Sequence, residues 1–338
     1  MTMILRPKPT VSCAGWRDPD QRGRGRNLLA NVPVFAGLRQ ALRPALAIFG
    51  MATPKIREGI PMNLTVTTSS RQDSSFASLF PFLLIAFGLA WGLFSLLFIV
   101  PQSLEGIFGP VSTTHPLFIT AVYSPAIAAV VLVLWFGGLR GLGQFLSRLL
   151  LWRCHPGWYA VLLVVIPLAF FAGSAVKVNL STMTFPFASF GAMLGAMAFM
   201  AVLGPMEEVG WRGCALPLLQ RKMTPFMASI ILGLIWGLWH FPAFMLGGTP
   251  QSDWSFLPFF IGTVSVSLIV TPMFNSSKGS ILLPVLFHFQ LNNPLWPDAQ
   301  PYDTIFFTAA AAVIVWLNRR AMFSRNAAVT EVIPGSGG

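Results

Sequence analysis

Long apolar stretches separated by short polar ones occupy the chain from residue 76 to residue 317. A helix needs about 20 mostly apolar residues to cross the hydrocarbon core of a bilayer. Runs that reach or approach this length cover residues 76–100, 117–138, 158–176, 187–216, 225–246, 256–274, 280–292 and 303–317, and the seventh is the shortest. The pattern therefore predicts an all-α fold, a polytopic membrane bundle of about eight transmembrane helices.

The composition supports a membrane protein, and the distribution of charge places most of the positive charge before the first apolar stretch. Apolar residues make up 54% of the chain and charged residues only 10%, whereas soluble domains carry roughly 25% charged residues. Residues 1–62 hold ten Lys or Arg and three Asp or Glu, so most of the net charge of +11 precedes the first apolar stretch. We expect a basic arm on the cytoplasmic side of a bilayer. No nucleic-acid partner is expected, because no basic stripe interleaved with aromatic residues occurs in a polar segment.

Three regions follow from this pattern. Residues 1–75 are rich in Arg, Pro and Gly with weak periodicity, and we expect a disordered cytoplasmic tail. Met62 begins a more ordinary membrane-protein N-terminus, so translation from Met62, which would omit residues 1–61, is a second interpretation. Residues 76–320 would form the membrane domain and residues 321–338 a second cytoplasmic tail.

The loops between the apolar stretches differ in charge. Basic residues follow the second, fourth, sixth and eighth stretches: Arg140, Arg148, Arg153, Arg221, Lys222, Lys278, Arg319, Arg320 and Arg325. The alternate loops hold Glu105, Asp253, Asp298 and Asp303, with Lys177 as the one exception. Because Lys and Arg accumulate in cytoplasmic loops, we expect both termini in the cytoplasm and the chain in the inner membrane of a bacterial-type cell.

Polar groups that are costly in a bilayer gather in the fourth, fifth and seventh stretches. They are Glu207, Glu208, Arg212, His240, His288 and Asn292. A charge at mid-bilayer costs at least about 2.5–3.5 kcal/mol, so ionisable groups inside a membrane are functional candidates. Glu208 and Arg212 are four residues apart and can pair on one helix face, which would hold Arg212 inside the protein and orient the helix. His288 and Asn292 likewise share a face.

These residue types suit two kinds of hydrolytic chemistry. Glu207 lies on another face from Glu208 and could point toward His240 and His288. A carboxylate beside an imidazole can activate a water, and a second imidazole with an amide can donate hydrogen bonds to an oxyanion. Alternatively, Glu207, His240 and His288 would be three ligands of a catalytic Zn²⁺ with an open fourth position. The HExxH signature is absent, and the pattern leaves both interpretations open.

These motifs resemble those of the CPBP (Abi) intramembrane proteases, which include the type II CAAX prenyl proteases. The sequence EEVGWR, which begins at Glu207, matches the EExxxR motif of that family. His240 matches the His of FxxxH, with Trp236 in place of the usual Phe, and His288 and Asn292 match HxxxN. The resemblance covers roughly residues 76–320, which would then be an intramembrane protease domain.

The resemblance implies an intramembrane endopeptidase with a polar cavity that reaches the cytosolic side. It implies that Glu207 and His240 activate the water, that His288 and Asn292 stabilise the oxyanion, and that Glu208 and Arg212 position the site or the substrate. The family has been described both as glutamate-dependent and as metal-dependent. Eukaryotic relatives cleave prenylated CAAX proteins, and many bacterial relatives act in bacteriocin or peptide maturation and immunity. A membrane-associated peptide or protein, prenylated or bacteriocin-like, is the expected partner.

Two other classes of function use the same side chains. A transporter could employ buried carboxylates and imidazoles as a proton relay, although no inverted repeat is evident in the sequence. A non-proteolytic immunity protein could bind a peptide in the cavity. Replacement of Glu207 by Gln in a cleavage assay would separate both from a protease.

Overall fold

Helices account for the secondary structure of the computed structural model, which describes residues 75–177 and 187–335. No strand occurs among these residues, and they belong to the compact unit that spans Thr68–Gly338. The predicted tail over residues 1–75 lies outside the described part, apart from Ser75, as does the alternative start at Met62.

The membrane pattern predicted from the sequence is confirmed. Within the part of the chain that the structure describes, six helical stretches are long and apolar enough to cross a membrane: Phe76–Ile99, Ser124–Leu150, Pro156–Lys177, Phe190–Gln220, Pro225–Met245 and Phe256–Ser276. Two shorter apolar helices, Leu282–Leu291 and Asp303–Leu317, correspond to the seventh and eighth predicted spans. The chain is thus an integral membrane protein of the all-α class, with about eight helices in its bundle.

Individual elements subdivide these spans. They are α2 (Leu79–Ile99), α3 (Pro101–Phe108), α4 (Pro116–Val122), α5 (Ser124–Leu146), α6 (Pro156–Ala160), α7 (Ile166–Lys177), α8 (Phe190–Val202), α9 (Glu207–Gly210), α10 (Leu216–Gln220), α11 (Pro225–Trp239), α12 (Phe256–Ser276), α13 (Leu282–Leu291), α14 (Asp303–Leu317) and α15 (Arg319–Met322). The short helix α3 was not predicted. Within α5, Gly138 has a non-helical φ of 60° and ψ of −162°, so the helix breaks at the predicted end of the second span and a second helical segment continues to Leu146. Glycine adopts this conformation because it lacks the Cβ that disfavours it.

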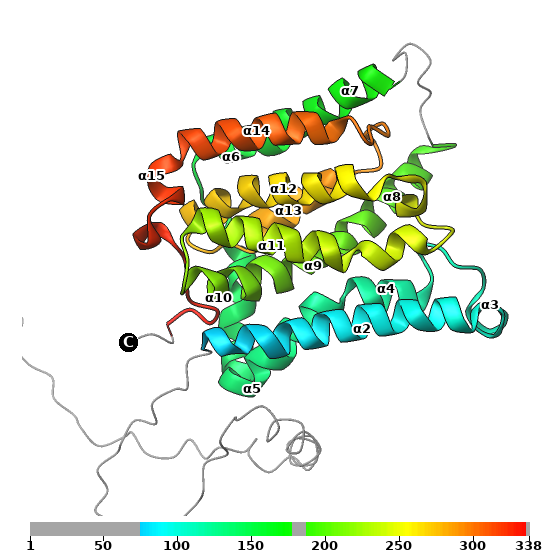
Figure 1. Ribbon diagram of the computed structural model, residues 1–338, viewed down its shortest axis with the longest axis horizontal. Helices are drawn as coiled ribbons and strands as arrows, with labels where there is room; N and C mark the ends of the chain where they lie inside the picture. Colours follow the sequence, from blue (N-terminus) through cyan, green and yellow to red (C-terminus); the bar gives the residue numbers. More distant parts are fainter. Residues whose placement is uncertain (1–74, 178–186, 336–338) are drawn as a thin grey trace, which may run out of the picture. The chain divides into compact units, whose positions relative to one another are not determined.

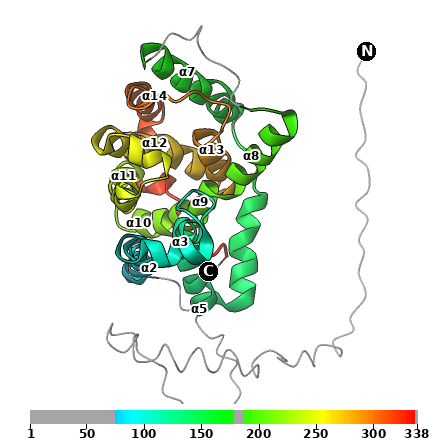
Figure 2. The ribbon, with the colours of Figure 1, turned by 90° about the vertical axis from the view of Figure 1, so that its right-hand side faces the viewer.

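The helices run side by side, with α10 and α15 at one end of the bundle and α3 and α8 at the other (Figure 1). Seen along the helices, α9 and α13 lie in the interior, with α12 on one side and α5 and α8 on the other (Figure 2). The elements that carry the candidate polar groups are therefore surrounded by other helices.

Close packing against α5 fixes the position of α9. A Cβ atom on Gly210 would overlap the backbone of Pro125, and one on Gly213 would lie 2.9 Å from the ring of Phe145. Small residues allow helix backbones to approach this closely in membranes. Directly after α9, residues Trp211–Ala215 form a π-helical turn, an irregularity that recurs at functional sites.

The C-terminal segment packs against the bundle as far as the structure describes it. Val332 and Ile333 are buried, and the carbonyl oxygens of Val329 and Thr330 accept hydrogen bonds from Gln220 and Arg221. The segment expected as a cytoplasmic tail from residue 321 onward is therefore an integrated part of the domain up to residue 335.

Candidate active site

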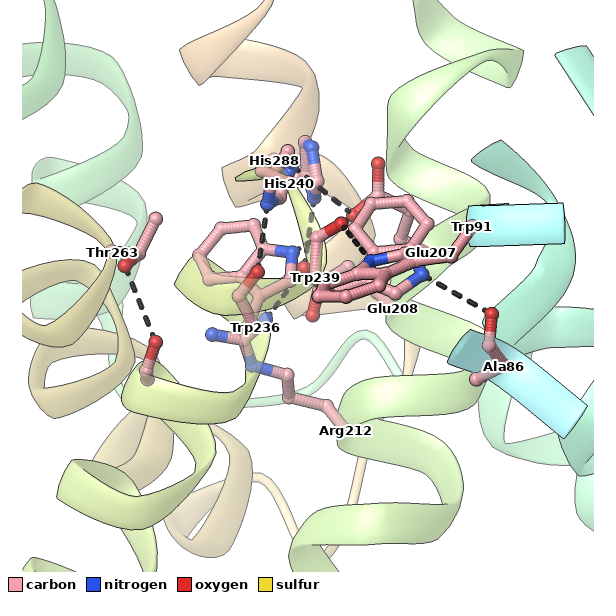
Figure 3. A network of polar contacts seen from close by, with 11 residues as sticks. Ala86, Trp91, Glu207, Glu208, Arg212, Trp236, Trp239, His240, Thr263 and His288 are labelled. Carbon is pink, nitrogen blue, oxygen red and sulfur yellow. Dashed lines mark hydrogen bonds and ion pairs between the residues drawn. The ribbon is translucent and has the colours of Figure 1, made fainter. Parts of the chain in front are cut away.

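The predicted site residues lie on or directly after three helices, α9, α11 and α13, and Arg212 lies in the π-helical turn that follows α9. Glu207 and Glu208 are the first residues of α9, and His240 directly follows α11. His288 belongs to α13, and Asn292 directly follows that helix. Figure 3 shows the two carboxylates, the two imidazoles and the Trp236 indole grouped together. The structure thus brings together residues that are up to 85 positions apart in the sequence.

Glu207 is buried, with an exposed fraction of 3%. Its carboxylate faces Trp236 of α11 and His240 at the end of that helix. The indole Nε1–H of Trp236 donates a hydrogen bond of 2.8 Å to Glu207 Oε2. His240 Nε2 lies 3.9 Å from the same oxygen, which is too far for a direct hydrogen bond. The gap is of the size that a bridging water occupies.

The tautomer of His240 follows from its second contact. His240 Nδ1 lies 2.8 Å from the carbonyl oxygen of Trp236. A carbonyl oxygen can only accept a hydrogen bond, so Nδ1 carries the proton. In neutral His240, Nε2 is therefore unprotonated and presents its lone pair toward Glu207.

Two tryptophans hold His240 in place by joining the end of α11 to α2. Trp91 Nε1 donates to the carbonyl oxygen of Trp239 at 3.2 Å. Trp239 Nε1 donates to the carbonyl oxygen of Ala86 at 3.3 Å. Trp239 is 3% exposed and packs its ring edge against His240, with centroids 4.8 Å apart.

Glu208 has a different set of partners from Glu207. Its Oε1 accepts 2.8 Å hydrogen bonds from Arg212 Nη1 and from His288 Nδ1. The predicted pairing of Glu208 with Arg212 is confirmed. His288 Nδ1 is thus bonded to Glu208, while Glu207, His240 and His288 all line the same cavity.

Arg212 is fully buried. Its guanidinium carbon also lies 4.7 Å from the ring centre of Trp236, within the range of a cation–π contact. The carboxylate of Glu208 and the indole face of Trp236 together compensate this cation, which would otherwise be costly to bury.

His288 Nε2 and the Asn292 amide converge next to Gly204. A Cβ atom on Gly204 would lie 3.0 Å from His288 Nε2 and 3.4 Å from Asn292 Cγ, and would overlap Asn292 Nδ2. The nitrogen atoms of both side chains therefore border one small volume that exists because residue 204 has no side chain. The neighbouring Asn293 is engaged elsewhere, since its Nδ2 donates to Gln290 Oε1 at 2.9 Å.

A cavity of about 420 Å³ adjoins these groups. Glu207, His240, His288 and Asn292 line it, and its remaining wall is largely aromatic and aliphatic. No serine or cysteine is among the lining residues in the part of the chain that the structure describes. Threonine hydroxyls do line the cavity, and those of Thr263 and Thr304 donate to backbone carbonyl oxygens.

The side chains of Glu207, His240 and His288 do not converge on one point, as the three-ligand zinc interpretation would require. Within residues 75–177 and 187–335, no group of three His, Cys, Asp or Glu side chains is placed to hold a single ion. His288 Nδ1 is bonded to Glu208, whereas Glu207 and His240 face each other. The described side chains thus do not fit a zinc site formed by Glu207, His240 and His288, and Zn²⁺ stays a prediction from the sequence alone.

Two residues at the site were not predicted. Trp236 was noted only as a replacement for the usual Phe, yet its indole adds a hydrogen-bond donor that Phe lacks. Its position four residues before His240 places both on one helix face, which was the available signal. Gly204 had no such signal, because its importance depends on the approach of α13.

The comparison with known proteins covers this region. Residues 187–293, which contain all of the polar groups described above, match the family model "Type II CAAX prenyl endopeptidase Rce1-like". A CAAX prenyl protease 2 from Methanococcus maripaludis is 35% identical over 122 residues, which are 32% of this chain and 45% of that protein. The match thus spans less than half the length of that relative. Over this segment, the resemblance to the type II CAAX prenyl endopeptidases that the motifs predicted is confirmed.

Proposed function

We propose that this chain is an intramembrane endopeptidase that hydrolyses a peptide bond of a membrane-associated substrate with a water activated by Glu207 and His240. The observation that carries this proposal is the pair of hydrogen-bond acceptors, a carboxylate and an imidazole nitrogen, that face each other across 3.9 Å at a cavity wall. The match to prenyl endopeptidases supports it independently.

In this mechanism, one water donates its two hydrogens to Glu207 and to His240 Nε2. Its oxygen lone pairs then remain free to attack a carbonyl carbon in the cavity. Glu207 accepts the proton as general base, a role that contributes typically 10²–10⁴-fold to a rate. Glu207 would then return that proton to the amine nitrogen as the C–N bond breaks, which completes the hydrolysis.

His288 and Asn292 would stabilise the oxyanion. The Asn292 amide is a donor in any protonation state. His288 gives its Nδ1 proton to Glu208, so its Nε2 is a donor only in the imidazolium form. Glu208 would balance the charge of that imidazolium and orient its ring, and Arg212 would hold Glu208 in place. Loss of one oxyanion donor typically costs 10²–10³ in kcat.

The residues that line the cavity indicate the substrate class. The cavity wall is rich in aromatic side chains, among them Trp236, Trp254, Phe259 and Trp296, so an apolar peptide segment or a peptide bearing an apolar group would fit. Prenylated CAAX-type and bacteriocin-like peptides both meet this description. The loop charges support a cytoplasmic location for both termini.

The test is cleavage of a panel of prenylated and apolar peptides by purified protein, with Glu207→Gln as the probe. Glu105→Gln is a matched control, because Glu105 is an exposed carboxylate on α3. We expect Glu207→Gln to lower kcat at least about 100-fold and Glu105→Gln to leave it unchanged. Cleavage by Glu207→Gln at the parental rate would refute the assignment of the base. A folded parent that cleaves no peptide in the panel would instead favour a binding or proton-relay function.

A chelator in the same assay addresses the metal question. The described arrangement predicts that cleavage continues after chelation. Loss of activity that Zn²⁺ restores would show that a metal ion takes part and that the ligand set differs from the one described.

A further inference from the structure

We propose that Asp303 makes one part of the cavity selective for a cationic side chain, so that the preferred substrate carries Arg or Lys close to the cleaved bond. This inference rests on the proposed protease function and adds a charge to the apolar substrate features described above. It follows from the charges that line the cavity, the burial of Asp303 and the packing that joins Asp303 to the catalytic groups.

Apart from the two imidazoles, the ionisable side chains that line the cavity are carboxylates. Glu207, Asp298 and Asp303 belong to the lining, whereas no Lys or Arg of the described residues does. Lys177 lies 2.6 Å from Asp298 Oδ2 and offsets the charge of that exposed residue. Glu207 is assigned to the water. Asp303 is therefore the carboxylate of the lining that has neither a catalytic role nor a cationic partner among the described residues.

Asp303 is the first residue of α14 and is 4% exposed. Its Oδ1 accepts a hydrogen bond from the Thr304 amide at 2.8 Å, and its Oδ2 accepts one from Gln300 Nε2 at 3.2 Å. The start of a helix favours a carboxylate, but both of these donors are neutral. A buried carboxylate without a nearby cation is costly, so a cation that enters the cavity would compensate it.

Two amide side chains of the lining have an unpaired oxygen atom. Gln300 directs its Nε2 to Asp303, and its Oε1 is buried without a hydrogen-bond partner in the described part of the chain. Gln251 Oε1 is likewise buried and unpaired there, as is the donor Trp296 Nε1. A guanidinium presents five N–H donors in one plane, so it can bond a carboxylate and an adjacent amide oxygen together, and the indole N–H suits a peptide carbonyl oxygen. The unpaired oxygens thus favour the same donor-rich cation as the carboxylate does.

Neighbouring helices fix the position of Asp303. Helix α14 lies between α7 and α12 (Figure 2). A Cβ atom on Gly173 of α7 would clash with the Asp303 amide nitrogen at 2.7 Å, so these two helices are in close contact. On the other side, Thr304 Oγ1 donates to the carbonyl oxygen of Pro258 at 3.0 Å. Side chains on such rigid elements are positioned more precisely than side chains on loops.

The same part of α12 joins this carboxylate to the catalytic groups. Phe259 follows Pro258 and packs its ring against His240, with centroids 5.0 Å apart. Phe259, His240 and Asp303 line one cavity of about 420 Å³, a size typical of ligand pockets. A cationic side chain bound at Asp303 would therefore belong to a residue close to the cleaved bond. The aromatic part of the wall remains available for an apolar or prenyl group, so the two substrate features do not compete.

The first test compares peptides that differ in charge at one position. A peptide that the purified parent protein cleaves is resynthesised with Arg, Lys, Gln or Glu at each position within about three residues of the cleaved bond, and kcat/KM is measured for each. At one of these positions, we expect the Arg and Lys peptides to exceed the Gln peptide at least about tenfold and the Glu peptide to be the poorest, because a desolvated charge pair favours the complementary partner and like charges repel. Equal kcat/KM for the Arg, Lys and Gln peptides at every position would overturn the inference and leave the protease function intact.

The second test asks whether Asp303 is the responsible carboxylate. The ratio of kcat/KM for the Arg peptide to that for the Gln peptide should fall to about one in Asp303→Asn. It should keep the parental value in Asp253→Asn, the matched control, because Asp253 is exposed and does not line the cavity. Both peptides are measured with one protein preparation, so a smaller folded fraction does not change the ratio. A parental ratio in Asp303→Asn would overturn the inference, whereas a folded parent that cleaves no peptide would refute the proposed function on which it rests.

Discussion

Replacement of Gly204 by Ala should inactivate the proposed protease without unfolding it. The added Cβ would overlap Asn292 Nδ2 and lie 3.0 Å from His288 Nε2. Backbone strain is not expected, because Gly204 lies in a right-handed helical turn and has no positive φ. The perturbation therefore acts on the two nitrogen atoms assigned to the oxyanion.

The size of the effect follows from the contacts. Carbon and nitrogen atoms need roughly 3.5 Å between them, so the Asn292 amide must move by more than about 1 Å or rotate away. Asn292 follows the end of α13 and is partly exposed, so it can give way at little cost in stability. His288 is buried and held by Glu208, so it moves less. A misplacement of about 1 Å can cost 100-fold in rate, and loss of one oxyanion donor 100- to 1,000-fold.

The assay measures kcat and KM for peptide cleavage together with the thermal unfolding temperature. Gly195→Ala is the matched control, because Gly195 lies on the neighbouring helix α8 and its Cβ would meet nothing within 4 Å. We expect Gly204→Ala to lower kcat about 100-fold or more with KM little changed, and Gly195→Ala to resemble the parent. Parental kcat in a folded Gly204→Ala variant would refute the assignment of His288 and Asn292 to the oxyanion.

Three further substitutions probe separate contacts. Trp236→Phe removes the hydrogen bond to Glu207 but retains the ring beside Arg212, so kcat should fall about tenfold, equivalent to roughly 1.4 kcal/mol of activation free energy, and the unfolding temperature should fall slightly because a buried oxygen loses its donor. An equal kcat would show that the indole donor is dispensable. Glu208→Gln leaves the buried Arg212 cation without a carboxylate, which costs about 3 kcal/mol, so unfolding temperature and kcat should both fall. A stability equal to that of the parent would contradict the view that Glu208 compensates the charge of Arg212. Arg148→Met leaves buried carbonyl oxygens without donors, at a cost of about 1–3 kcal/mol each. Thermal stability should therefore fall, while kcat measured at low temperature should stay near the parental value. Arg140→Met, at an exposed position, is the control that should unfold like the parent.

The bundle could be predicted from the sequence because length and apolarity alone determine which segments can cross a bilayer. The eighth predicted span, residues 303–317, agrees with α14 at both ends. The predicted end of the second span at Gly138 agrees with the break in α5 there, whereas the helical segment that follows the break could not be predicted in this way. A glycine before a basic segment is typical of a helix end, but whether the chain resumes a helix after it depends on packing against neighbours.

The site was predictable at the level of residue identity but not of pairing. Charge cost singled out Glu207, Glu208 and Arg212, and helical spacing paired Glu208 with Arg212 correctly. The partner of His288 depends on how α13 rotates against α9, which no local pattern encodes. For the same reason the role of Gly204 became visible only when α13 was placed beside it.

The structural difference between the two adjacent glutamates explains why one of them is proposed as the base. Glu208 accepts hydrogen bonds from a buried arginine and an imidazole, so its negative charge is compensated and its Oε1 is occupied. Glu207 has one indole donor and faces an imidazole nitrogen that presents a lone pair. A buried carboxylate with so little compensation is stabilised by any further hydrogen-bond donor that reaches it, and at a cavity wall that donor is water. Two identical side chains one residue apart thus have environments suited to separate roles, as in enzymes that use paired carboxylates. Glu207→Gln should therefore lower kcat at least about 100-fold at little cost in stability, in contrast to the combined loss expected for Glu208→Gln.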